Sequence, residues 1–281
     1  MAPNTPHTAF VLGGGGRWGA VEVGMLRALL EAGIEPDLVV GTSIGAFNGA
    51  VFAADPTASG IEQLTAMWYE VQTSEVLRSN VIERAKVLAR LKVAIHDPAE
   101  LRAILMRVLP GATFETLAVR FECVAASIER AAEHWFCTGD LIEPLLASAA
   151  IPGLFPPIEV GGEHFYDGGL VNSVPIDRAI DLGATDIYVL QVGRIEQPLR
   201  VPTRIHETAL IAFEISRRHR FGSHRDRDIP GVSMHVLPSA NPVEFDDRRQ
   251  IKWTDLGETS TLIEAAYQAS IDYLAAERHQ R

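Results

Sequence analysis

A serine held between two glycines is the segment of this 281-residue chain with the clearest chemical meaning. Gly41-Thr42-Ser43-Ile44-Gly45 follows the apolar run 38–40 and precedes the helix-prone run 46–52. A Gly-x-Ser-x-Gly segment between a strand and a helix is typical of a nucleophile elbow, where a sharp turn exposes the serine oxygen. The N-terminal dipole of the following helix favours negative charge near that oxygen. Ser43 is therefore the candidate nucleophile.

A serine hydroxyl is a weak nucleophile until a base accepts its proton, and the sequence offers two kinds of base. The usual base is a histidine oriented by a carboxylate. Of the nine histidines, His235 is the best placed for a Ser-His-Asp triad, because it lies near the end of a late strand, although an ordinary strand histidine is the more common case. A desolvated carboxylate can also serve directly, because burial raises its pKa.

Asp167 is the carboxylate that we expect to act as this base. It follows the expected strand 164–166 and precedes Gly168 and Gly169, which allow another backbone to approach closely. Strand ends are where α/β proteins gather their functional groups. An isolated Asp-Gly is by default an ordinary turn. Beside a serine elbow, the functional interpretation is favoured.

A glycine-rich loop supplies candidates for stabilising an oxyanion. Gly14, Gly15 and Gly16 can present backbone N–H groups without side-chain obstruction, between the first expected strand and the first expected helix. Arg17 could add a further N–H group or its guanidinium. These groups would face the negative charge that forms when a serine attacks an ester.

The same loop also supports a different class of protein. Gly14, Gly16 and Gly19 form a literal Gly-x-Gly-x-x-Gly, the pattern of dinucleotide-binding proteins. Such proteins place an acidic residue about 20 positions later, at the end of the second strand. Asp37 has this spacing but precedes the run 38–40, which puts it at the start of that strand. The sequence therefore disfavours a dinucleotide site.

The hydrophobic pattern predicts an α/β fold with a parallel sheet and helices on both of its faces. The N-terminal half reads as strand, helix, strand and helix, and a helical block then interrupts the alternation as an insertion at about 57–110. We expect one domain over 1–281. The expected elements are strands at 8–12, 38–42, 121–128, 134–138, 164–166, 187–192 and 232–237, and helices at 20–32, 141–150 and 254–277.

Composition narrows the function classes. The net charge of −11 argues against a general nucleic-acid binder. The N-terminus lacks the regions of a signal peptide and no apolar run reaches transmembrane length, so we expect a cytoplasmic protein. No Cys/His cluster has zinc-ligand spacing. Basic clusters at 78–92 and 217–227 are either solvated helix faces or a surface for peripheral contact with anionic membranes.

With these motifs in order, residues 8–192 resemble the patatin-like phospholipases. The resemblance implies a three-layer α/β/α sandwich with a mostly parallel sheet and a Ser-Asp dyad. It assigns Ser43 as nucleophile, Asp167 as base and the 14–16 loop as oxyanion hole. The matching segments are 12–19, 41–45 (with Gly41 and Gly45), 147–157 and 167–175 (with Gly168 and Gly169). Two departures are that Trp18 stands where the family usually has a basic residue and Glu22 replaces a frequent histidine.

The resemblance implies a lipid acyl hydrolase, of phospholipase A or lipid esterase type, that works through an acyl-enzyme. It implies neither a metal nor an organic cofactor. The expected partner is a lipid or acyl-ester substrate, with no nucleic acid. The lipid headgroup, the acyl-chain length and the oligomeric state are left open.

Overall fold

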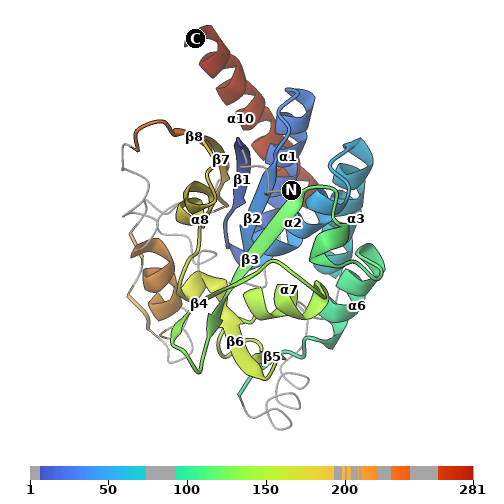
Figure 1. Cartoon of the computed structure of the whole chain (residues 1–281), viewed down its shortest axis with the longest axis vertical. Coiled ribbons are helices and arrows are strands. Elements are labelled where there is room, and N and C mark those ends of the chain that lie inside the picture. Colours follow the sequence, from blue (N-terminus) through green and yellow to red (C-terminus); the bar gives the residue numbers. More distant parts are fainter. Residues whose placement is uncertain are drawn as a thin grey trace.

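A computed structural model of the chain describes residues 7–73, 93–192, 198–199, 201–203, 208, 211–219, 229–240 and 259–280. Its centre is an eight-stranded sheet, with helices on both faces (Figure 1). The strands are β1 (Thr8–Leu12), β2 (Leu38–Thr42), β3 (Arg120–Ser127), β4 (Ala132–Phe136), β5 (Ile158–Val160), β6 (Glu163–Asp167), β7 (Asp186–Leu190) and β8 (Ser233–Leu237).

The helices follow the sequence pattern closely. The named α-helices are α1 (Ala20–Glu31), α2 (Ile44–Ala54), α3 (Ala58–Thr73), α6 (Ala99–Val108), α7 (Ile142–Ser148), α8 (Ile176–Asp181) and α10 (Thr259–Gln280). Short 3-10 turns are η1 (Gly16–Gly19), η2 (Phe114–Thr116) and η3 (Gly168–Leu170). Residues 211–219 are also helical. The predicted strand–helix–strand–helix beginning of the chain is confirmed.

The sheet has a parallel centre and an antiparallel extension. The strand order is β5-β6-β3-β2-β1-β7-β8, with β4 paired to β3. Strands β3, β2, β1, β7 and β8 run parallel, whereas β4 and β6 pair with β3 in the antiparallel sense. Parallel strands need crossovers, and those crossovers carry the helices that cover both faces.

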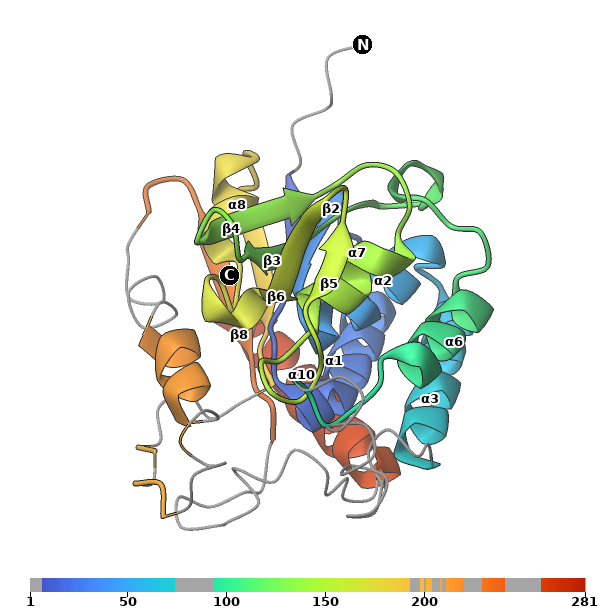
Figure 2. The same ribbon diagram turned by 90° about the horizontal axis from the view of Figure 1, so that it is seen from below.

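Two apolar layers pack against the opposite faces of this sheet. Phe10, Leu12 and Val39 point towards the larger cluster, which includes buried residues of α1, α2, α3 and α10. Their neighbours Ala9 and Val11 point to the other face, where α8 packs. Figures 1 and 2 show α8 on one side of the sheet and α1, α2 and α3 on the other. The predicted three-layer α/β/α fold is confirmed.

The point where β2 and β6 meet is the feature of the topology that matters most for chemistry. Both strands pair with the same edge of β3, because β4 occupies the other edge. Thr42, the last residue of β2, lies opposite Val124, and Asp167, the last residue of β6, lies opposite Ala125. The two strands run in opposite directions, so their carboxyl ends face each other one position apart along β3.

Part of the expected helical insertion is present beside this sheet. The helix α3 packs against α1 and α2, and α6 packs against α3 and α7. The basic segment of this block (Arg78, Arg84, Lys86, Arg90 and Lys92) lies outside the described residues. The single-domain boundaries and the membrane-contact hypothesis therefore stay predictions. Within the described part of the chain, none of the helices has the length and hydropathy of a membrane span.

Candidate active site

Ser43 forms a strained turn between β2 and α2. Its backbone has φ 56° and ψ −124°, a conformation that a residue with a side chain rarely adopts. The flanking glycines make this turn sterically feasible. A Cβ on Gly41 would lie 2.6 Å from the Gly45 carbonyl oxygen, and one on Gly45 would lie 2.5 Å from the Leu12 carbonyl oxygen. The elbow that the sequence motif indicates is therefore present.

The carboxylate of Asp167 accepts a hydrogen bond from the hydroxyl of Ser43. Ser43 Oγ donates to Asp167 Oδ2 at 2.6 Å, and the Gly169 N–H donates to Asp167 Oδ1 at 2.7 Å. The Asp167 side chain is completely buried. Burial raises its pKa to about 7, although the hydrogen bonds from Ser43 and Gly169 lower it, as does the nearby charge of Arg217. A carboxylate with this pKa is poised to accept a proton near neutral pH.

Ser148 bridges the backbones of β2 and β3 at the point where these two strands separate. Its hydroxyl accepts a hydrogen bond from the Ser43 N–H at 2.9 Å and donates one to the Val124 carbonyl at 2.6 Å. Both backbone groups would otherwise be buried without this hydrogen bond, at the point where the ladder between β2 and β3 ends. A glycine is required at position 168, because a Cβ there would lie 2.3 Å from the same Val124 oxygen. Ser148 stands in a family-like segment, but the sequence alone did not assign it a function.

The glycine loop lies directly against the elbow. A Cβ on Gly14 would be 3.3 Å from Ser43 Cβ, and a Cβ on Gly19 would be 2.6 Å from the Ile44 side chain. Gly16 has φ +56°, which favours glycine. The N–H of Gly14 already donates to the Ser173 carbonyl at 2.8 Å, so this predicted oxyanion donor is occupied.

The remaining candidates in the loop are the backbone N–H groups of Gly15, Gly16 and Arg17. Gly15 is the N-cap of η1, and residues 16 and 17 open this 3-10 turn. The first N–H groups of a helical turn lack partners within the turn, which makes them suitable anion donors. The side chain of Arg17 lies outside the described residues, so its expected guanidinium contribution stays a prediction.

A buried polar cluster that the sequence did not reveal contacts the end of this loop at Gly19. Asn48 of α2 donates to the Gly19 carbonyl at 2.8 Å and to Glu22 Oε2 at 2.7 Å, and it accepts from Trp68 Nε1 at 2.9 Å. Glu22 is completely buried, and this burial raises its pKa well above the usual range. The raised pKa disfavours a second negative charge near the site.

His235 does not lie near Ser43. Through the pairings of β8, β7, β1 and β2, it shares the register position of Val39. Three strand spacings and four residues along the strand separate it from Ser43, on the order of 20 Å. Its ring nitrogens instead lie 3.1 Å from Asp186 and 3.6 Å from Glu277. The triad alternative is therefore geometrically disfavoured.

The dinucleotide alternative also meets an obstacle. Asp37 accepts hydrogen bonds from the backbone N–H groups of His7 and Thr8, at the amino end of β1. The glycine loop follows the carboxyl end of the same strand. The acidic residue is thus at the opposite end of the sheet from the loop.

Arg217 is the main departure from the charge pattern read in the sequence. It belongs to a basic cluster for which we expected a solvated or lipid-facing surface, yet it is 5% exposed. Its guanidinium contacts the Gly14 carbonyl. Periodicity in residues 217–227 gave no sign of this, because a buried arginine and an exposed one look alike in sequence.

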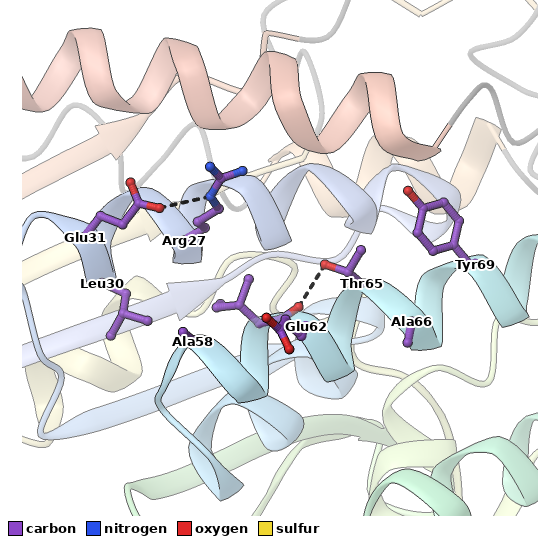
Figure 3. A pocket seen from close by; sticks show the side chains of 9 residues that line it. Arg27, Leu30, Glu31, Ala58, Glu62, Thr65, Ala66 and Tyr69 are labelled. Atoms are coloured by element: carbon purple, nitrogen blue, oxygen red, sulfur yellow. Dashed lines mark hydrogen bonds and ion pairs between the residues drawn. The ribbon is translucent and has the colours of Figure 1, made fainter.

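One further concavity is distinct from these residues. A pocket of about 500 Å³ lies between α1 and α3 and is lined by Arg27, Leu30, Glu31, Ala58, Ile61, Glu62, Thr65, Ala66 and Tyr69 (Figure 3). None of the predicted site residues lines it. Among the described residues, no group of three or more His, Cys, Asp or Glu side chains is arranged to hold a metal ion.

Comparison with known proteins places this chain in a family. The family described as "Patatin-like phospholipase" matches residues 10–180, which is more than half of the chain. The chain belongs to this family. The matched stretch contains the elbow, the glycine loop and the Asp-Gly-Gly turn, but not Arg217.

The individual relatives are much longer proteins. Patatin-like phospholipase domain-containing protein 6 of Mus musculus is 33% identical over 187 residues, covering 66% of this chain and 13% of that protein. Lysophospholipase nte1 of Aspergillus niger is 30% identical over 186 residues, covering 66% and 12%. Among solved structures, VipD from Legionella pneumophila has a TM-score of 0.48 at 14% identity, covering 97% of this chain and 67% of its own.

The raised pKa of Asp167 predicts that Asp167→Asn stabilises the folded protein increasingly as pH rises. Below about pH 4 the carboxyl is protonated in both folded and unfolded chains. Between there and pH 7 the folded chain binds the extra proton, so the free energy of unfolding falls with pH. The asparagine variant escapes this loss, which reaches at most about 4 kcal/mol above pH 7.

Urea unfolding of the parent and the variant at pH 5, 6, 7 and 8 measures this difference. Asp181→Asn, at an exposed position in α8, is the matched control and should show little pH-dependent change. A difference between Asp167→Asn and the parent that is constant from pH 5 to pH 8 contradicts the raised pKa.

Proposed function

We propose that this protein is a serine acyl hydrolase that cleaves acyl esters of lipids through a Ser43-Asp167 dyad. The observation that carries the proposal is the 2.6 Å hydrogen bond from Ser43 Oγ, on a strained elbow, to a completely buried carboxylate. A nucleophile within hydrogen-bond reach of a base with pKa about 7 is the arrangement that activates serine for covalent catalysis.

The first half of the proposed reaction forms an acyl-enzyme. Ser43 Oγ bonds to the ester carbonyl carbon while its proton passes to Asp167. The carbonyl oxygen becomes an oxyanion, which the backbone N–H groups of Gly15 and Gly16 stabilise. The carbon–oxygen bond to the alcohol then breaks, and the alcohol leaves with the proton held by Asp167.

The second half releases the acyl group as a carboxylic acid. A water molecule gives its proton to Asp167 and bonds to the acyl carbon, which regenerates the oxyanion at the same position. The bond to Ser43 breaks, and the proton returns to the serine oxygen. The same carboxylate serves as base in both halves, so no histidine is required.

Family membership supports lipids as the substrate class. The names of the relatives include phospholipase and lysophospholipase, and this chain matches 13% and 12% of the lengths of those two proteins. A lipid ester as substrate, a cytoplasmic setting and peripheral contact with anionic lipid surfaces are parts of this proposal. The basic residues between positions 78 and 92 of the sequence would suit such contact.

The dyad predicts which substitutions remove reactivity. Ser43→Ala and Asp167→Asn should each lower hydrolysis of a soluble acyl ester by at least about 1,000-fold, because either loss leaves no activated nucleophile. A fluorophosphonate probe followed by peptide mass mapping should label Ser43. The labelling rate should rise with pH and level off above about 7, as Asp167 loses its proton.

His235→Ala is the matched control, since His235 lies in the distant strand β8, where its ring contacts Asp186 of β7 and Glu277 of α10. It should keep most of the parent's activity. A loss of activity in His235→Ala equal to that in Ser43→Ala would indicate a triad. Labelling of another serine would contradict the assignment of Ser43 as nucleophile.

The lipid part of the proposal has its own test. We expect fatty acid release from lysophosphatidylcholine or phosphatidylcholine at a kcat/KM at least about 10-fold above that for a short soluble ester, because remote acyl contacts contribute binding energy. Mass spectrometry of the released acid measures it, with Ser43→Ala as the blank. Hydrolysis of short esters without hydrolysis of these lipids would support a serine hydrolase and contradict the proposed lipid substrate.

A further inference from the structure

The helix formed by residues 211–219 (the docking helix) packs against the turn that carries Asp167. A Cβ on Gly169 would lie 2.9 Å from the Phe213 ring, so the aromatic side chain rests directly on this glycine. Ser216 Oγ donates to the Leu170 carbonyl at 2.6 Å. The docking helix therefore holds the Asp-Gly-Gly turn by one apolar contact and one hydrogen bond, although it lies beyond the family-matched stretch.

The same helix reaches the glycine loop through Arg217. Arg217 Nη1 donates to the Gly14 carbonyl at 2.8 Å. The Gly14 N–H donates to the Ser173 carbonyl at 2.8 Å, and Ser173 Oγ donates to the Arg217 carbonyl at 2.7 Å. These three hydrogen bonds form a closed ring of Gly14, Ser173 and Arg217, so the backbone of Gly14 is held through both its N–H and its C=O.

Holding the Gly14 carbonyl also orients the next N–H group. The peptide unit between Gly14 and Gly15 is planar and trans, so its C=O and N–H bonds point in opposite directions. A guanidinium on the carbonyl therefore directs the Gly15 N–H away from Arg217. Without such a restraint, a run of glycines can rotate its peptide units at little steric cost.

The positive charge of Arg217 is retained in this buried position by a matched carboxylate. Arg217 Nε and Nη2 lie 3.1 and 3.0 Å from the two oxygens of Glu214, which is itself 7% exposed. Arg218 also donates to Glu214 Oε2 at 3.2 Å. Arg217 acts to lower the pKa of Asp167 and Glu214 acts to raise it, so the pair is electrostatically coupled to the proposed base.

We propose that Arg217 is a positioning residue of this site, which fixes the Gly14–Gly15 peptide so that the Gly15 N–H faces the oxyanion. This inference rests on the proposed acyl transfer at Ser43. It makes the docking helix a required part of the catalytic unit, because one element restrains both the oxyanion loop and the turn of the base. A piece of the chain limited to the family-matched stretch would lack this restraint.

Kinetics of Arg217→Gln and Arg217→Lys in the full chain test the proposal. The oxyanion is absent from the bound ester and forms only as Ser43 attacks, so Arg217→Gln should lower kcat for a soluble ester by about 10- to 100-fold with KM within about 3-fold. The midpoint of the pH dependence of kcat should shift to higher pH, because a positive charge near Asp167 is lost. Arg217→Lys keeps a charged donor and should recover part of kcat and most of the midpoint.

Arg218→Gln is the matched control, since it removes an equal charge and a contact to the same Glu214. It should leave kcat within about 3-fold of the parent. Folded Arg217→Gln with the parent's kcat, KM and pH midpoint overturns the proposal. If Arg217→Gln does not fold, Arg217→Lys decides: a kcat equal to the parent's overturns the proposal, and a reduced kcat at unchanged KM supports it.

Amide NMR separates failure of this inference from failure of the proposed function. A parent that hydrolyses no ester and leaves Ser43 unlabelled refutes the function. In that case hydrogen exchange at the Gly14 amide, which donates to the Ser173 carbonyl within this ring, still tests the restraint. Exchange at least about 10-fold faster in the Arg217 variants than in Arg218→Gln supports it, and equal exchange overturns it.

Discussion

Two strands of opposite direction end one position apart on a single edge of β3, and the rest of the site depends on this constraint. Because β2 stops opposite Val124 and β6 stops opposite Ala125, the chain must leave the sheet twice at one point. Ser43 follows one strand end and Asp167 is the other. The 2.6 Å hydrogen bond between them is thus a consequence of strand register.

This meeting point has a cost that nearby groups offset. Ser43 occupies a strained conformation, and a carboxylate is removed completely from water. The Ser148 hydroxyl replaces a ladder hydrogen bond, and the Gly169 N–H supports the carboxylate. Strain of this kind is of order 1–3 kcal/mol and persists only where surrounding structure enforces it. The buried carboxylate gains a pKa near neutrality from the same environment that makes it costly.

The sequence predicted the local parts of the site and the class of fold. Ser43 and Asp167 could be selected because each stands beside a strand signal and glycines, which short-range patterns reveal. The contacts of Ser148 and Arg217 could not be predicted, because they join residues far apart in the chain. Burial of Arg217 depends on Glu214 and on the carbonyl of Gly14, and charge patterning shows neither.

Two other outcomes have equally specific causes. Gly14 was expected to donate to an oxyanion, but the loop after Asp167 places the Ser173 carbonyl on its N–H. His235 was a triad candidate because it lies near a strand end, and only the strand order shows that β8 is at the edge of the sheet away from β2. Hydrophobic periodicity predicts strands but not their neighbours.

Direct titration of the Asp167 carboxyl tests the central claim, that burial beside Ser43 turns this carboxylate into a base at neutral pH. Protein labelled with ¹³C at aspartate carboxyls gives the midpoint by NMR, with the resonance assigned by its absence in Asp167→Asn. The account predicts a midpoint near pH 7. A midpoint near pH 4, the value of an aspartate in water, would contradict it.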